Sequence, residues 1–243
     1  MEQNLKLTNS DGEVLNDPSQ FRRLVGRLFY LTITRQEITY AVNILSKFMH
    51  QPRKPHLDAA LHILRYLKGS PGQGLLFSSN NKLHLIGYCD SNWANCPMKR
   101  RSTSGYCVFL GNSLISWKTK KQKMVSRSPA KAEYCSMAAA TCELAWLRYL
   151  LKDLQVTNLG PTKLFCENQA ALYIAANPVY HKHTKHIEID CHVVREKVQA
   201  GQIAASFVPS ASQLADLFTK MLGSNAFHNL VRKLGIFDIH APT

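Results

Sequence analysis

The stretch TSGYCVFLGNSLISWKT, residues 103–119, contains two β-rich runs that are separated by the pair Gly111-Asn112. A Gly-Asn pair between two such runs is typical of the turn of a β-hairpin, because both residue types tolerate a left-handed backbone. The pattern therefore predicts strands over residues 103–110 and 113–119. The preceding runs 75–79 and 82–89 are also β-rich, and three antiparallel strands in succession are the simplest arrangement here.

Downstream of the hairpin, the chain alternates between helical and β-rich segments. Ser128-Pro129 supplies a helix N-cap followed by proline at the first helical position, and apolar residues recur at helical spacing as far as Leu154. The remaining pattern predicts strands over residues 163–166 and 203–208, and helices over residues 169–176, 184–200, 211–221 and 225–234. A hairpin followed by alternating strands and helices predicts an α/β fold with a mixed sheet flanked by helices.

Residues 17–69 differ from the rest of the chain because only helical patterns occur there. Three apolar stripes with i, i+3, i+4 and i+7 spacing begin at Phe21, Ile38 and Leu57, and the segment GSPG at residues 69–72 ends the last of them. We therefore expect four parts along the chain: a polar tail over residues 1–16, a helical segment over 17–70, the sheet domain over 75–222, and a helix with a tail over 223–243.

The composition excludes several classes of protein. The 243 residues include 45% hydrophobic residues, enough for a packed core, which excludes a disordered or collagen-like chain. No apolar run approaches the ~20 residues of a membrane span and the polar start lacks a signal peptide, so we expect an intracellular protein, cytoplasmic or nuclear. The seven cysteines form no C-x-x-C pair, and we interpret them as thiols rather than as disulfides or zinc ligands.

Positive charge is concentrated in one stretch. The chain has 30 Lys and Arg against 16 Asp and Glu, a formal net charge of +14, and no acidic residue occurs between Asp90 and Glu133. Such a stretch attracts polyanions, and nucleic acid is the polyanion that we expect in a cell; the alternative is a solvated basic face that only aids solubility. The residues predicted to bind nucleic acid are Lys99, Arg100, Arg101, Lys118, Lys120, Lys121, Lys123 and Arg127.

Four acidic residues lie where the predicted strands and helices would bring them together. Asp90 follows the strand over residues 82–89, and Glu167 closes the next short strand. Glu133 lies in the first turn of the long helix, and Asp216 lies in the helix after the last strand. Clustered carboxylates need cations, and their oxygens suit Mg²⁺ or Mn²⁺, which can act in pairs on a phosphodiester. Each acid alone has a structural alternative, as a turn cap, a partner of a helix dipole or a surface acid.

Four longer motifs surround these acids, namely YCDSNWA (residues 88–94), SRSPAKAEY (126–134), FCENQ (165–169) and QLADLFTK (213–220). In this order they resemble the ribonuclease H domain in the Pol polyproteins of copia-type retrotransposons. Residues 101–106, 116–118 and 185–192 are similar to further segments of that domain, and residues 21–26 and 64–69 are similar to the reverse transcriptase thumb and connection. The resemblance covers residues 17–237.

The resemblance implies a ribonuclease H-like fold, with a mixed five-stranded sheet flanked by helices and a small all-helical segment before it. It also implies an endonuclease that hydrolyses the RNA strand of RNA–DNA hybrids with two Mg²⁺ or Mn²⁺ ions. In the matching motifs, the positions of the catalytic metal ligands are occupied by Asp90, Glu133, Glu167 and Asp216. The implied partners are an RNA–DNA hybrid or another nucleic acid, and the rest of a reverse transcriptase.

Motifs of the other Pol enzymes are missing from the sequence. There is no Tyr-x-Asp-Asp motif of a polymerase and no Asp-Ser/Thr-Gly motif of a protease, and no integrase module fits beside the segments already assigned. Polymerase, protease and integrase activities are therefore not expected. We expect either the C-terminal piece of a Pol polyprotein or an independent gene left by a truncated element.

Two residues depart from the family pattern. Glu167 stands where the third motif usually has Asp, and Mg²⁺ requires near-ideal octahedral geometry, so we expect weakened Mg²⁺ activity that Mn²⁺ partly rescues. Lys131 stands where the family usually has an acid, and we interpret it as surface drift with its side chain in solvent. Two alternatives to an active nuclease stay open: a catalytically impaired nucleic-acid-binding remnant, and a protein-interaction module. Among the tryptophans, Trp146 is expected in the core and Trp93 at the rim of the site.

Overall fold

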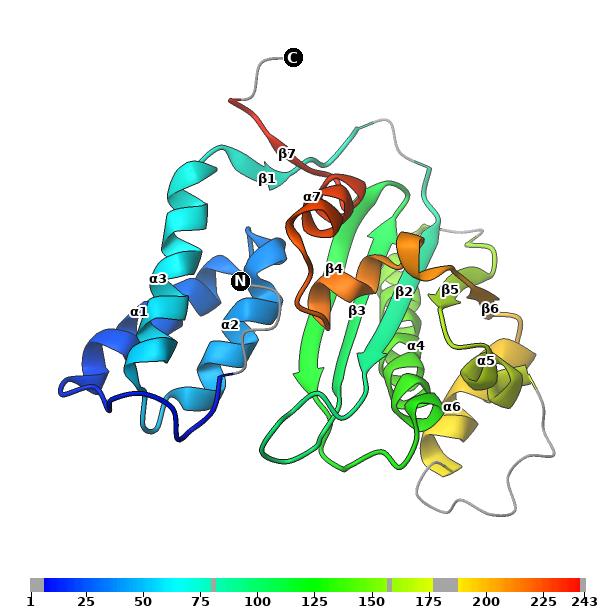
Figure 1. The fold of residues 1–243 in the computed structure, drawn as a ribbon. Coiled ribbons are helices and arrows are strands. Elements are labelled where there is room, and N and C mark those ends of the chain that lie inside the picture. Colours follow the sequence, from blue (N-terminus) through cyan, green and yellow to red (C-terminus); the bar gives the residue numbers. More distant parts are fainter. Residues whose placement is uncertain (1–6, 80–81, 157–158, 177–187, 241–243) are drawn as a thin grey trace. The chain divides into compact units, whose positions relative to one another are not determined.

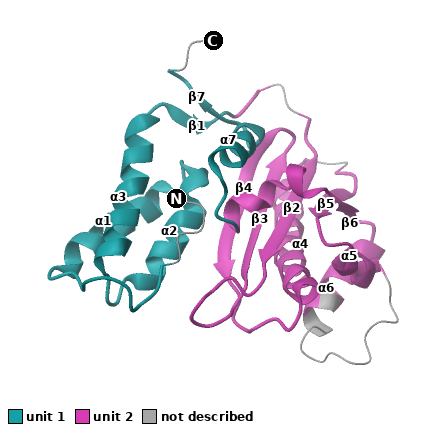
Figure 2. Cartoon of the chain, in the orientation of Figure 1, with its two compact units in different colours: residues 1–76, 220–243 teal, residues 77–219 magenta. Residues whose placement is uncertain are grey.

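A computed structural model describes residues 7–79, 82–156, 159–176 and 188–240 of the chain (Figure 1). The chain forms two compact units, one made of residues 1–76 and 220–243 and the other of residues 77–219 (Figure 2). Each unit has its own hydrophobic core. Within the described ranges, no helix is both long enough and apolar enough to cross a lipid bilayer.

The larger unit is built on a mixed five-stranded sheet, as predicted (Figure 1). Its strands are β2 (Leu85–Asn92), β3 (Thr103–Leu110), β4 (Ser113–Lys121), β5 (Thr162–Cys166) and β6 (Ile203–Phe207). Their spatial order is β4-β3-β2-β5-β6. Strands β2, β3 and β4 pair antiparallel, whereas β5 runs parallel to both of its neighbours. The predicted hairpin is confirmed, and Gly111 makes its turn with a φ of 59°. The fold class is therefore the ribonuclease H-like one that the motifs imply.

Helix α4 (Pro129–Asp153) is the main helix packed on this sheet. The predicted cap is confirmed, because the side chain of Ser128 accepts a hydrogen bond from the backbone N–H of Lys131 at 3.2 Å. The buried face of α4 includes Tyr134 and Leu144, which share one core with Leu164 of β5. Helices α5 (Gln169–Ala176) and α6 (Glu188–Gln199) complete this layer, and α6 contacts both α4 and α5. The first four residues of the predicted helix 184–200 lie outside the described residues.

The prediction of a single helix over residues 211–221 is wrong. The structure has two short 3₁₀ segments instead, η3 (Ser210–Ser212) and η4 (Leu214–Phe218). Between them, Gln213 is extended, with φ −78° and ψ 100°. Its Nε2 donates to the carbonyl oxygen of Cys89 at 3.0 Å, and its Oε1 accepts from the backbone N–H of Ala215 at 3.2 Å. The fully buried Gln213 side chain therefore ties this segment to β2, which a continuous helix would not do.

Two further sequence predictions are wrong. The run 75–79 forms no strand beyond Leu75, which ends β1 (Gln73–Leu75), and Leu76 and Phe77 are 61% and 62% exposed. Because Leu76 and Phe77 are exposed, they pack against no hydrophobic core that would stabilise a strand at these positions. Trp146 is 56% exposed instead of buried, because its neighbours on α4 already fill the core-facing positions.

The smaller unit contains the predicted helical segment and the end of the chain. Its helices are α1 (Pro18–Leu31), η1 (Gln36–Ile38), α2 (Thr39–Leu45), η2 (Ser46–Phe48), α3 (Lys54–Gly69) and α7 (Ser224–Lys233). Asp17 caps α1 by accepting from the backbone N–H of Ser19 at 2.9 Å. Strand β1 pairs antiparallel with β7 (Ile236–Asp238), which joins the last segment of the chain to the first. The sequence pattern did not predict this non-local pairing.

Candidate active site

Three of the four predicted acids form one carboxylate cluster. Asp90, Glu133 and Glu167 each offer an oxygen atom, and these atoms all lie within 4.8 Å of one another. Asp90 belongs to β2, Glu167 directly follows β5, and Glu133 lies near the start of α4. Strands β2 and β5 are parallel neighbours, so their carboxyl ends meet at the same edge of the sheet. The cap at Ser128 then begins α4 close enough for Glu133 to join them.

Hydrogen bonds from the surrounding residues orient two members of this cluster. The hydroxyl group of Thr219 donates to Oδ2 of Asp90, and both side chains are fully buried. The backbone N–H of Ser91 donates to Oε1 of Glu133 at 3.1 Å. Partners of this kind set the direction in which a carboxylate offers its remaining lone pairs.

The position of Thr219 depends on a close approach between η4 and β3. A Cβ atom on Gly105 would lie 2.6 Å from Cγ2 of Thr219 and 2.9 Å from the Cβ of Phe218. Only a residue without a side chain leaves room for this contact. Gly105 therefore allows Thr219 to reach Asp90.

The cluster is strained electrostatically when it holds no cation. Burial, with a further contribution from the charge of Asp90, raises the pKa of Glu133 to about 10. A divalent cation would remove this penalty by neutralising the carboxylates. A set of carboxylate oxygens is also the ligand chemistry that Mg²⁺ and Mn²⁺ prefer. The residues present therefore fit a divalent metal.

Asp216 is not a member of this three-carboxylate cluster. Its side chain is buried in η4, a segment that packs against β2 and β3. The carbonyl oxygen of Asp216 accepts from the backbone N–H of Thr219 at 3.1 Å, so it helps to hold the residue that bonds to Asp90. Its role as a fourth metal ligand stays a prediction.

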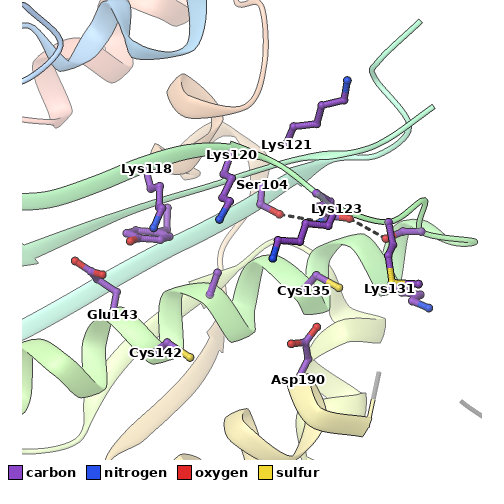
Figure 3. A pocket seen from close by; sticks show the side chains of 15 residues that line it. Ser104, Lys118, Lys120, Lys121, Lys123, Lys131, Cys135, Cys142, Glu143 and Asp190 are labelled. Atoms are coloured by element: carbon purple, nitrogen blue, oxygen red, sulfur yellow. Dashed lines mark hydrogen bonds between the residues drawn. The ribbon is translucent and has the colours of Figure 1, made fainter. Parts of the chain in front are cut away.

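The basic residues fall into two groups. Lys118, Lys120, Lys121 and Lys123 line a cavity of about 520 Å³, together with Lys131 (Figure 3). The other predicted residues do not line it: Lys99, Arg100 and Arg101 precede β3, and Arg127 precedes α4. Lys131 is half-buried and lines this cavity, and its interpretation as surface drift stays a prediction.

Sequence reasoning missed Gln122, which links the cavity to the carboxylate cluster. Its Nε2 donates to Oγ of Ser104 at 2.8 Å and to the carbonyl oxygen of Ala132 at 2.9 Å. A longer contact of 3.4 Å reaches Oγ of Ser91, beside Asp90. No sequence pattern marks a single glutamine among lysines as part of a site. Thr219 could have been marked as a site residue, because it lies three residues after Asp216 within the motif QLADLFTK. Trp93 is 44% exposed and its Nε1 donates to the carbonyl oxygen of Ser126 at 2.9 Å.

No family model matches the chain. Curated relatives do: the retrovirus-related Pol polyproteins from transposons RE1 and RE2 of Arabidopsis thaliana are 45% and 43% identical over 231 and 234 residues. These matches cover 95% and 96% of the chain. The corresponding polyprotein from transposon TNT 1-94 of Nicotiana tabacum is 34% identical over 204 residues, which is 84% of the chain. The chain spans only 16%, 16% and 15% of the lengths of these relatives.

Among solved structures, similar chains include the N-terminal RNase H domain of a Mycobacterium tuberculosis protein, with 13% identity and a TM-score of 0.39 over 62% of this chain and 98% of that chain. LC11-RNase H1, solved in complex with an RNA/DNA hybrid, has 11% identity and a TM-score of 0.41 over 56% of this chain and 93% of that chain. The identity of 45% to the RE1 polyprotein over nearly the whole chain decides the family. The chain belongs to the family of copia-type retrotransposon Pol polyproteins, and its larger unit has a ribonuclease H-like fold.

Proposed function

We propose that this chain is a ribonuclease H-like endonuclease that hydrolyses the RNA strand of RNA–DNA hybrids with two divalent metal ions. The observation that carries the proposal is the convergence of Asp90, Glu133 and Glu167 to within 4.8 Å at one edge of the sheet. These three residues would hold the ions, with Asp216 as the fourth ligand. Membership of the Pol family supports the same activity.

Bound Mg²⁺ or Mn²⁺ would supply activation of a water molecule and stabilisation of the leaving oxygen. The protein's own part is to position the ligands. Thr219 holds Oδ2 of Asp90, and the backbone N–H of Ser91 holds Oε1 of Glu133. The carboxyl group of Glu133, with its raised pKa, must lose its proton before it can bind a cation.

The remaining predicted basic residues would bind the nucleic-acid backbone. Lys99, Arg100 and Arg101 lie just before β3, whose first residues pair with the end of β2 beyond Asp90. Arg127 directly precedes the capped start of α4, which carries Glu133. Cations at these positions would attract phosphates of a hybrid to the carboxylate cluster, and binding would weaken steeply with salt.

The carboxylate of Glu167 bears on the alternative of an impaired remnant. Although its side chain is one methylene longer than the usual Asp, its oxygen belongs to the same cluster. This position of Glu167 favours an enzyme with a changed metal preference. It speaks against the alternative, a fold that has lost its metal site.

Incubation of the purified chain with a labelled RNA–DNA hybrid, in Mg²⁺ and separately in Mn²⁺, tests the proposal. We expect cleavage of the RNA strand that is lost in the Asp90→Asn variant, which also excludes a contaminating nuclease. Hybrid binding without cleavage in either metal would contradict the enzyme assignment and support the impaired remnant. Neither binding nor cleavage would support the protein-interaction module.

A further inference from the structure

The cavity of about 520 Å³ lies between the sheet and α4 (Figure 3). Its first wall comes from two paired strands, since Ser104 and Tyr106 of β3 lie opposite Lys120 and Lys118 of β4. Alternate residues of a strand share one face of the sheet. These four side chains therefore form one continuous patch that faces α4.

The second wall is one stripe of α4. Lys131, Cys135, Ala139 and Cys142 follow one another at spacings of four, four and three residues, which places them on the same side of the helix. Glu133 lies two positions after Lys131, and two residues turn a helix by about 200°. The cavity and the carboxylate cluster therefore use different sides of α4. Three of the four residues in this stripe have small side chains, which leaves the space between the walls open.

A hydrogen-bonded glutamine, Gln122, connects the two walls of the cavity. Gln122 bonds to Ser104 of β3 and to the backbone of α4 at Ala132, as described above. Its Oε1 accepts from Oγ of Ser126 at 2.8 Å. The two walls are thus joined by direct bonds, and the cavity is a built feature of the larger unit.

Positive charge at this cavity is not balanced by ion pairs. In the part of the chain that the structure describes, the ion pairs are Arg35–Glu37 and Lys197–Glu196. None of the cavity's lysines takes part in one. Lys121 is already engaged, because its Nζ donates to Sγ of Cys96 at 2.9 Å. The four remaining ammonium groups belong to Lys118, Lys120, Lys123 and Lys131.

These groups would repel one another around an empty space, and an anion bound between them would relieve the repulsion. Two carboxylates also line the cavity, from Glu143 and Asp190. Glu143 accepts from Oγ of Ser116 at 2.7 Å and keeps further lone pairs for a ligand. The cavity therefore offers cations, hydrogen-bond acceptors and apolar surface within one space.

We propose that this cavity binds one nucleotide unit, a base with its phosphate, that is held there without being cleaved. Its volume lies in the range of about 300–1,000 Å³ that is typical of small-ligand sites. The ammonium groups would hold the phosphate, and the lysine stems with Ala139 would contact the base. Glu143 and Asp190 would accept hydrogen bonds from base amino groups or a ribose hydroxyl. This inference goes beyond the nuclease activity, since the unit can be a free nucleotide or an unpaired nucleotide of a strand.

Calorimetric titrations in EDTA test the proposal without any contribution from metal-dependent cleavage. The probes are adenosine 5′-monophosphate, inorganic phosphate and a short single-stranded oligonucleotide. The Lys118→Gln/Lys120→Gln variant removes two cavity charges, and Lys152→Gln/Lys163→Gln removes two exposed charges elsewhere in the same unit. We expect the nucleotide to bind at least 10-fold more weakly to the first variant and within 2-fold of the parent to the second.

A second variant pair tests the space itself. Ala139 is exposed on α4, so Ala139→Trp should fill the cavity without disturbing the core, and thermal melting checks that the fold is kept. We expect Ala139→Trp to abolish nucleotide binding, whereas Ala139→Ser should bind like the parent. Equal affinities for nucleotide and inorganic phosphate, equal losses in the two charge variants, or normal binding by Ala139→Trp would each overturn the proposal. Tighter binding of the oligonucleotide than of the mononucleotide identifies a strand as the source, and equal affinities identify free nucleotide.

Discussion

The hydrogen bond from Thr219 to Asp90 predicts how a residue outside the metal ligands controls metal binding. Both side chains are fully buried, and the bond joins the residue that follows η4 to β2 across 129 residues of sequence. Thr219→Val keeps the shape of the side chain, including the methyl group that lies against Gly105. It removes only the donor, so Oδ2 of Asp90 loses this hydrogen bond inside the protein.

The magnitude follows from the charge of the acceptor. A hydrogen bond to a charged group contributes ~1.5–3 kcal/mol, so we expect the free energy of unfolding to fall by about 2 kcal/mol. Loss of a partner that orients a metal ligand typically weakens metal binding by ~10–100-fold. Urea unfolding in EDTA measures the first quantity, and calorimetric titration with Mn²⁺ measures the second. Thr219→Ser is the matched control, because it keeps the hydroxyl group.

Either of two results would refute this reasoning. If the Val variant bound Mn²⁺ as tightly as the parent, the bond to Thr219 would not orient Asp90 for metal. If the Ser variant, which keeps the hydroxyl group, lost as much affinity as the Val variant, the hydrogen bond to Asp90 would not by itself account for the loss.

Three further predictions follow from the same site. Glu167→Asp should raise Mg²⁺-dependent cleavage by about 10–100-fold and lower the ratio of Mn²⁺ to Mg²⁺ activity. The reason is that a shift of ~1 Å in a reacting group lowers the reaction rate on the order of 100-fold. A variant no more active than the parent in Mg²⁺ would contradict this prediction. In metal-free protein, Glu133 keeps its proton up to about pH 10 when folded but ionises near its ordinary pKa of 4.5 when unfolded, so the free energy of unfolding should fall as pH rises between these values. Glu133→Gln should remove that part of the pH dependence in urea titrations, and an unchanged profile would count against the raised pKa. Gly105→Ala should push η4 away from β3 and lower the unfolding free energy by ~1–3 kcal/mol, as measured by urea unfolding, because the new methyl group has no room beside Thr219 and Phe218.

Local signals in the sequence were sufficient to predict the sheet, the long helix and the three members of the carboxylate cluster. The hairpin could be predicted because Gly111 and Asn112 encode a turn that needs no distant partner. The start of α4 could be predicted because Ser128 caps the helix within its own first turn. Asp90 and Glu167 follow parallel neighbouring strands, so the topology alone places them at one edge.

Features that depend on distant partners could not be predicted. The helix expected over residues 211–221 breaks at Gln213, whose amide group bonds to the backbone of Cys89 on β2. The pairing of β1 with β7 joins segments about 160 residues apart, which the register shows and no local pattern does. The exposure of Trp146 depends on which side of α4 the sheet occupies.

The sequence by itself determined the fold class and the acids of the candidate site, because turn residues, helix caps and strand-end acids act over a few residues. The tertiary structure alone decided which acids meet and what holds them. It placed Asp216 outside the three-carboxylate cluster and set Thr219 against Asp90. It also gathered five lysines around one cavity, and a count of charges along the sequence cannot separate these lysines from their neighbours. These arrangements arise from packing between segments far apart in the chain, where local sequence preferences carry no information.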